Sequence, residues 1–299
     1  MRTSFCGELA LGLSMVFAGA ACGSDDETGT AQIFIVPEDT IPDGLDPGTE
    51  LENIHDGWTI RYDRYLVAVG NFRAKRSDTG ESLSDPTLFV LDLKNAPTNG
   101  YVVKEFQNVA AVRWDKFGFD IPNAKTGAST LPPTAQADVD FMITNGYSVY
   151  YEGSGEKDTT KITFKFGFAA GTSFDDCATP PPNELPGFAV PSGGTVPVKP
   201  TLHGDHQYFS NVTQGVEITE RLAQWLMTCD ADMNKDLTIA ELKACDAATA
   251  LPTPPYDLTS VKDQDGDMKI TVYDYVNKQM RTFGDYEGDG ECPTRAPLP

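Results

Sequence analysis

The sequence predicts an α+β protein, with an N-terminal β-sandwich followed by a small α-helical domain. Short runs of alternating apolar and polar residues recur up to residue 209, and the clearest run covers residues 159–169. Pro and Gly crowd residues 178–200, which favours a loop within the first domain. After Thr219 the apolar residues recur at helical spacing instead. The β-sandwich is therefore expected over residues 55–209 and the helical domain over residues 211–292.

Turn signals separate roughly seven or eight short strands in the first domain. Asn145-Gly146 lies between the runs 138–144 and 147–151, and it predicts a β-hairpin because both residues tolerate positive φ. Helical periodicity is absent from this region. Further strands are expected at residues 59–69, 88–93, 101–106 and 111–119.

The first 21 residues are typical of an export signal. Arg2 precedes a mainly apolar run from Leu9 to Ala21, which is too short to span a bilayer. The small residues before Cys22 resemble the cleavage box of bacterial lipoproteins. That resemblance implies a lipidated Cys22 and a mature protein anchored in the cell envelope, at the outer membrane or surface. Ordinary secretion, with Cys22 merely near the cleavage site, is the alternative.

Acidic residues outnumber basic ones, 44 to 23, and the net charge is −21. Nucleic acid and anionic membrane surfaces would be repelled, so we expect no nucleic-acid partner and membrane contact through the lipid anchor only. Residues 22–54 contain no Lys or Arg and are expected to form an extended tether, in which Ile33 to Val36 could pair with the domain edge. Residues 293–299 are expected to form a short tail.

With Cys22 lipidated, four Cys remain in the mature chain, as expected of a disulfide framework in an oxidising compartment. Four Cys allow three pairings, and the sequence does not choose among them. The pair Cys229 and Cys245 is favoured because these residues bracket one compact unit. Cys177 and Cys292 would then join the two domains.

The segment from Asp230 to Glu241 resembles the twelve-residue calcium loop of EF-hand proteins, as in calmodulin-like and dockerin-like modules. In that family, side chains at alternate positions point inward and supply oxygens to the ion. Leu237 occupies the apolar eighth position. The resemblance implies side-chain ligands from Asp230, Asp232 and Asn234, a backbone carbonyl from Asp236, a water-mediated ligand from Thr238 and two oxygens from Glu241.

A second segment with the same pattern runs from Asp263 to Asp274, with Ile270 at its eighth position. In the family, the two eighth positions pair with each other. Residues 219–229 are expected to form the helix that enters the first loop, and Thr238 with Glu241 makes a capping box for the next helix. The resemblance therefore implies a paired EF-hand unit with about two calcium ions. Its second set of ligands is Asp263, Asp265, Asp267, the carbonyl of Lys269, Thr271 through water, and Asp274.

The departures from the family pattern lower the expected affinity. Lys235 and Met268 stand at the sixth position, where Gly is usual, and each should cost on the order of 1 kcal/mol in strain. Asp274 is shorter than the usual Glu, which relaxes selectivity against magnesium. We expect dissociation constants of roughly 10⁻⁴ to 10⁻³ M, as in extracellular modules. A third acidic cluster, residues 285–291, lacks an acid at its twelfth position and is expected to be a solvated tail.

The three histidines of the chain are His55, His203 and His206. They would bind zinc or copper if the fold brought them together, with Asp56 or Asp205 as a further ligand. The alternative is that they are polar loop residues with local hydrogen bonds. Asp56-Gly57-Trp58, the run from His203 to His206 and the calcium loops together are similar to a group of exported bacterial proteins. That similarity suggests an architecture and no activity.

The sequence contains no serine nucleophile elbow, phosphate-binding Gly loop or zinc-protease helix. The leading interpretation is a non-enzymatic, calcium-binding exported lipoprotein with a structural or binding role. Its surface ligand would be a protein or a carbohydrate. A zinc- or copper-binding protein that uses His55, His203 and His206 is the second hypothesis, and a calcium-dependent secreted hydrolase is the third.

Overall fold

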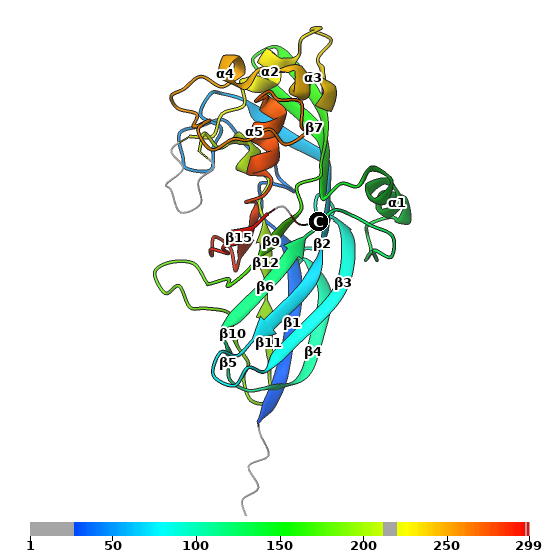
Figure 1. Ribbon diagram of the computed structural model, residues 1–299, viewed down its shortest axis with the longest axis vertical. Helices are drawn as coiled ribbons and strands as arrows, with labels where there is room; N and C mark the ends of the chain where they lie inside the picture. Colours follow the sequence, from blue (N-terminus) through cyan, green and yellow to red (C-terminus); the bar gives the residue numbers. More distant parts are fainter. Residues whose placement is uncertain (1–26, 212–219, 297, 299) are drawn as a thin grey trace, which may run out of the picture.

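The computed structural model describes residues 27–211, 220–296 and 298 (Figure 1). This part of the chain is elongated and mostly β, with curled sheets at one end and short helices at the other. The predicted export signal and Cys22 lie outside the described residues. No helix in the described ranges is long and apolar enough to cross a membrane.

The largest sheet has eight strands in the order β13, β8, β7, β2, β6, β9 and β15, with β3 also paired to β2. The long strand β2 pairs with β7 in its first half and with β6 in its second half. The register shifts next to Asn71, which has a φ of 50°, so the strand bends there. The strands are β2 (Thr59–Lys75), β3 (Ser82–Asp92), β6 (Lys116–Ile121), β7 (Val149–Lys157), β8 (Thr160–Phe168), β9 (Thr172–Phe174), β13 (Asp236–Thr238) and β15 (Thr294–Arg295).

A second sheet of five strands is centred on β1, which pairs antiparallel with β4 and parallel with β11 and β12. The last strand, β14, pairs antiparallel with β12. Residues 28–37, within the stretch expected to be a tether, form β1, with Ala31, Ile33 and Ile35 buried. The bounds are β1 (Thr28–Pro37), β4 (Tyr101–Ala110), β11 (Thr195–Val198), β12 (Pro200–Leu202) and β14 (Gly284–Tyr286); β5 (Arg113–Trp114) pairs separately with β10 (Phe188–Ala189).

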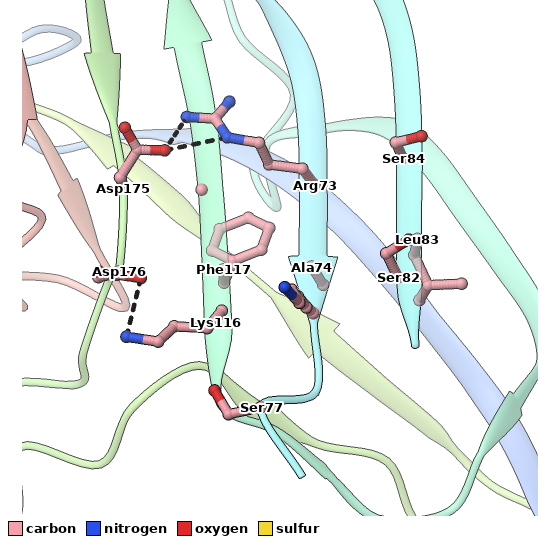
Figure 2. Close-up of a pocket in the computed structure, with 12 residues that line it drawn as sticks. Arg73, Ala74, Ser77, Ser82, Leu83, Ser84, Lys116, Phe117, Asp175 and Asp176 are labelled. Atoms are coloured by element: carbon pink, nitrogen blue, oxygen red, sulfur yellow. Dashed lines mark hydrogen bonds and ion pairs between the residues drawn. The ribbon is translucent and has the colours of Figure 1, made fainter. Parts of the chain in front are cut away.

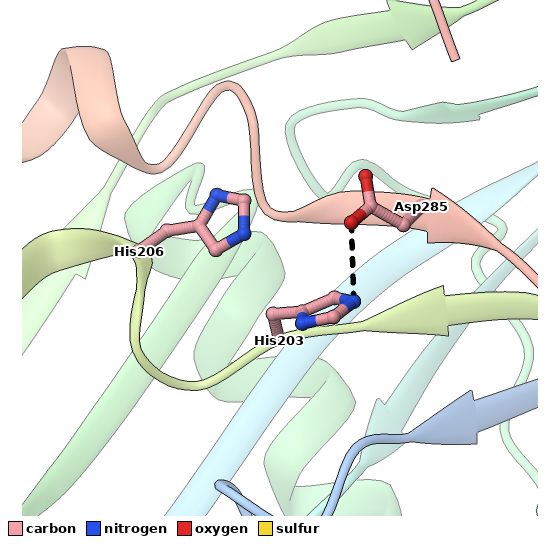
Figure 3. Close-up of side chains that lie close together, drawn as sticks. All are labelled: His203, His206 and Asp285. Carbon is pink, nitrogen blue, oxygen red and sulfur yellow. Dashed lines mark ion pairs between the residues drawn. The ribbon is translucent and has the colours of Figure 1, made fainter. Parts of the chain in front are cut away.

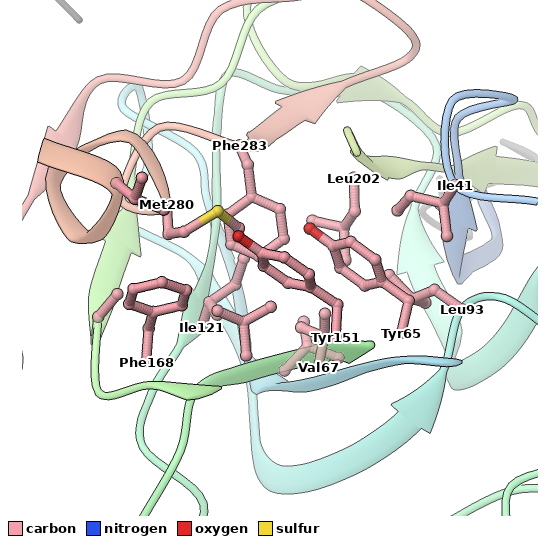
Figure 4. Packing of buried hydrophobic residues seen from close by; sticks show 14 of the residues in the cluster. Ile41, Tyr65, Val67, Leu93, Ile121, Tyr151, Phe168, Leu202, Met280 and Phe283 are labelled. Atoms are coloured by element: carbon pink, nitrogen blue, oxygen red, sulfur yellow. The ribbon is translucent and has the colours of Figure 1, made fainter. Parts of the chain in front are cut away.

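One hydrophobic core joins the sheets to the C-terminal segment. Its buried residues run from Ala31 to Cys292 in a single cluster. Figure 4 shows Tyr65 and Tyr151, from the main sheet, packed beside Met280 and Phe283, which follow the last helix. The C-terminal segment therefore shares the core of the sheets and is not a separate domain.

The prediction of a hairpin at Asn145-Gly146 is wrong. Residues 136–145 form a helix, α1 (Gln136–Asn145), and Gly146 caps its C-terminus at a φ of 65°. Val139 and Met142, three residues apart, are buried in a small cluster against the outer side of the main sheet. The Asn-Gly pair supplies positive φ in either structure, which explains the error.

The predicted small α-helical domain with a paired EF-hand is also wrong. The helices of this segment are short: α2 (Trp225–Cys229), α3 (Ile239–Ala244), α4 (Ala247–Ala250) and α5 (Val272–Gln279). In the described residues the eighth positions of the two loops do not pair with each other. Leu237 lies in β13 and pairs in parallel with Phe164 of β8, while residue 271 bridges to Asp246. The open edge of β8 offers unpaired backbone groups and an apolar face, and the first loop docks there.

Two disulfides connect the C-terminal segment, Cys177–Cys292 and Cys229–Cys245. They are the pairing that the sequence favoured. Cys229 and Cys245 flank the loop at 230–241, so this bond encloses the first candidate calcium loop.

Candidate functional site

The loop at residues 230–241 gathers three carboxylates. Asp230, Asp232 and Glu241 each offer one oxygen to a cluster whose atoms lie within 4.8 Å of one another. Asp230 follows the end of α2, and Glu241 lies in the first turn of α3. Thr238 and Glu241 form the capping box expected from the sequence, which fixes the Glu241 side chain at the loop.

Two oxygens of this cluster are buried without a hydrogen-bond partner, Asp230 Oδ1 and Glu241 Oε1. The other oxygen of each carboxylate is engaged: Asp230 Oδ2 accepts from the Lys235 amide at 3.1 Å, and Glu241 Oε2 accepts from the Thr238 amide at 2.9 Å. Asp230 is only 8% exposed. A buried carboxylate oxygen without a partner is costly, and a bound cation would satisfy both oxygens at once.

The remaining predicted ligands of the first loop follow the turn of the backbone. Asp232 accepts from the amide of Asn234 at 3.1 Å, and Asn234 accepts from the amide of Asp236 at 2.7 Å. The Asp236 side chain accepts from Thr163 of β8 at 2.8 Å, away from the cluster, as suits a residue that offers only its carbonyl. Lys235 has a φ of 67°, the left-handed backbone that a sixth position requires.

The loop at residues 263–274 forms a similar cluster from Asp263, Asp265 and Asp274. Here the Asp274 oxygens are both engaged, Oδ1 by the Gln264 amide at 2.7 Å and Oδ2 by the Thr271 amide at 2.8 Å. Asp265 lies 3.1 Å from the ammonium group of Lys243. This second cluster is therefore already satisfied by hydrogen bonds and by a lysine.

Other features of the second loop repeat those of the first. Met268 has a φ of 67° at the sixth position. The Met268 amide donates to Asp263 Oδ2 at 2.8 Å, and hydrogen bonds from this and neighbouring amides lower the pKa of Asp263. Asp267 accepts from the Lys269 amide at 2.8 Å. Thr271 is the N-cap of α5 and forms a capping box with Asp274.

His203 and His206 come together with a residue that the sequence analysis did not select, Asp285. Figure 3 shows the two rings on one chain segment, facing Asp285 on β14. His203 and His206 are 5% and 8% exposed. Asp285 belongs to the residues expected to form a solvated acidic tail, and that expectation is wrong for this residue because β14 pairs with β12.

His55 and Asp205 do not join this cluster in the described part of the chain. His55 Nε2 lies 3.1 Å from the carbonyl oxygen of Glu50, in a separate loop. Asp205 accepts from the guanidinium group of Arg221, with both contacts at 2.7 Å. The sequence therefore identified two of the three residues in this cluster, and its other candidates do not belong to it.

The electrostatic environment differs among the three clustered residues. Burial lowers the pKa of His203, but the hydrogen bond to Glu38 and the charge of Asp285 outweigh it and raise that pKa to about 10. Burial lowers the pKa of His206 to about 3. Burial also raises the pKa of Asp285 to about 7. His206 is thus a neutral imidazole at neutral pH.

A surface pocket lies at the other end of the molecule, beside β2, β3 and β6 (Figure 2). Four of its charged side chains form two ion pairs, Arg73 with Asp175, and Lys116 with Asp176 at 3.1 Å. The Arg73–Asp175 pair lowers the pKa of Asp175 against the effect of burial, which raises it. The lining also contains Lys75, and it adds no residue to the three clusters described above.

The chain matches no known protein family, and no curated protein or solved structure shows significant similarity to it.

Proposed function

We propose that the protein binds calcium at the loop of residues 230–241, with the loop of residues 263–274 as a second, weaker site. One observation carries the proposal: Asp230 Oδ1 and Glu241 Oε1 are buried and accept no hydrogen bond. Both residues cluster with the carboxylate of Asp232. The −21 net charge of the chain attracts cations to this surface.

The donor set favours calcium over a transition metal. The first loop offers carboxylate, amide and carbonyl oxygens, and it offers no imidazole or thiolate, since both flanking Cys are joined in a disulfide. Calcium takes six to eight oxygens at about 2.3–2.6 Å in flexible geometry, whereas magnesium demands a stricter octahedron. The carboxylate and carbonyl oxygens of a flexible twelve-residue loop therefore suit the larger ion.

The proposed role of calcium is to stabilise the fold of an exported, non-enzymatic lipoprotein. β13 joins the first loop to the main sheet, so an ion bound there would tie the edge strand β13, and through it β8, to α3. With a dissociation constant of roughly 10⁻⁴ to 10⁻³ M, the site would be filled at extracellular calcium concentrations. Binding to the folded state alone adds about 2.7 kcal/mol at a ligand concentration of 100 times the dissociation constant.

Calorimetric titration of the calcium-free full chain tests the proposal. We expect two binding events, of which the tighter one disappears in the variant Asp230→Asn/Glu241→Gln. Calcium should also raise the melting temperature of the wild type, by roughly 2–4 °C for each kcal/mol of binding free energy. The matched control is Asp140→Asn, which removes one exposed carboxylate from α1 and should bind calcium as the wild type does.

Absence of heat and of thermal stabilisation at about 10 mM calcium would contradict the proposal, because even the weakest extracellular sites bind in that range. An unchanged isotherm in the double variant would also contradict it, since the tighter site would then lie outside the first loop.

A further inference from the structure

Three separate parts of the chain meet at His203. β12 ends at Leu202, beside Pro37 at the end of β1 and Gly284 at the start of β14. The residues that follow these positions are His203, Glu38 and Asp285. The His203 amide donates to the Phe283 carbonyl at 3.0 Å, so backbone pairing fixes the ring near Asp285.

Each of the two imidazoles has its Nδ1 held by a partner outside the cluster. His203 Nδ1 lies 2.8 Å from Glu38 Oε2, and Thr40 Oγ1 donates to that same oxygen at 2.8 Å. His206 Nδ1 lies 2.9 Å from Thr282 Oγ1. A carboxylate or hydroxyl on one ring nitrogen fixes the orientation of a histidine and leaves the other nitrogen to bind a metal.

The contact between His203 and Asp285 is not a hydrogen bond. His203 Nε2 lies 3.2 Å from Asp285 Oδ2, but the geometry leaves this buried nitrogen without a hydrogen-bond partner. Two ligands bound tetrahedrally to zinc at about 2.0–2.1 Å are about 3.3 Å apart. The separation of the two atoms is therefore the one expected of two ligands that share a zinc ion.

We propose that His203, His206 and Asp285 bind one divalent transition metal ion of the zinc class. Two imidazoles and one carboxylate suit zinc and its neighbours, whereas calcium prefers an all-oxygen set. The site is thus chemically distinct from the two acidic loops. Asp289 is exposed and clusters with Glu38 and His203, so it adds negative charge beside His203.

A metal-free structural role is the competing account. In that account His203 carries a proton and forms an ion pair with Glu38 and Asp285, and the cluster takes up no metal. The zinc site predicts that the protein takes up zinc and that His206 is a ligand. The ion pair predicts no zinc uptake and does not require the His206 ring.

Zinc titration of the chelator-treated full chain, in about 10 mM calcium, separates the accounts, because the calcium loops are then occupied. We expect one zinc ion per chain. Asp285→Asn and His206→Gln should each weaken binding by at least about 100-fold, and Glu38→Gln, which alters only the partner of His203, by about 10–100-fold. The matched control is His55→Gln, a histidine outside the cluster, which should leave the isotherm unchanged.

Cobalt supplies a second readout that does not depend on the variants. Bound Co²⁺ in the wild type should give the visible absorption of a four- or five-coordinate ion with nitrogen ligands, and zinc should displace it. Melting curves recorded without metal show whether each variant is folded.

Three outcomes would contradict the proposed zinc site. The first is no zinc uptake by the wild type at about 100 μM, and the second is a zinc isotherm that Asp285→Asn and His206→Gln leave unchanged. The third is a loss of zinc binding in the control His55→Gln as large as in those two variants. Failure of calcium binding alone would leave this inference intact, since the two sites share no ligand.

Discussion

The loops at residues 230–241 and 263–274 carry the same kinds of residue at matching positions, and their sixth residues have the same φ of 67°. Their carboxylates are nevertheless in different states. In the first loop, Asp230 and Glu241 each keep one buried oxygen without a partner. In the second loop, hydrogen bonds engage both oxygens of Asp274, and Lys243 neutralises Asp265.

The attachment of each loop to the fold accounts for this difference. The first loop is joined to β8 through β13, is enclosed by Cys229–Cys245, and buries Leu237 completely. The second loop has no strand pairing among the described residues beyond the bridge of Thr271 to Asp246, and Ile270 at the matching position is 36% exposed. A twelve-residue pattern can therefore specify the loop backbone, whereas the surrounding fold decides which oxygens remain available to an ion.

The largest effect is expected at the eighth position. Leu237→Ala should destabilise the protein by about 2–5 kcal/mol, because it opens a cavity in the shared core. The matched substitution Ile270→Ala should cost less than about 1 kcal/mol, since that side chain is already partly in water. Urea unfolding of both variants measures the two values. Equal losses would remove the distinction between an anchored and an unanchored loop.

A smaller and equal effect is expected at the sixth position, where the two loops agree. Lys235→Gly and Met268→Gly should each stabilise the calcium-free protein by about 0.5 kcal/mol, because glycine removes the left-handed strain of about 1–2 kcal/mol at some cost in chain entropy. Thermal melting of both variants checks this. A lower melting temperature in either variant would mean that the replaced Lys235 or Met268 side chain makes contacts that outweigh the backbone strain.

Local patterns in the sequence predicted much of the secondary structure. The alternating run at 159–169 forms β8, and the strand expected at 101–106 lies within β4, because period-two patterning needs only one buried face. The capping box of Thr238 and Glu241 was also predictable, since its two residues are close in the chain.

Features that depend on distant partners were not predictable. Leu237 lies in β13, which pairs with β8. The sequence does not show which strand of a sheet will be left with an edge to pair. Asp285 was grouped with its acidic neighbours because nothing local marks it for a strand beside β12. At α1, the spacing of Val139 and Met142 was the available helical signal, and the Asn-Gly turn signal obscured it.

The most direct test of the account is a crystal structure of the protein grown with calcium, with anomalous data collected to locate the ion. The account predicts an anomalous peak in the loop at 230–241, within about 2.3–2.6 Å of Asp230 Oδ1 and Glu241 Oε1. It also predicts higher occupancy there than in the loop at 263–274. An empty first loop, with those two oxygens bonded to other protein groups, would contradict the proposed calcium site.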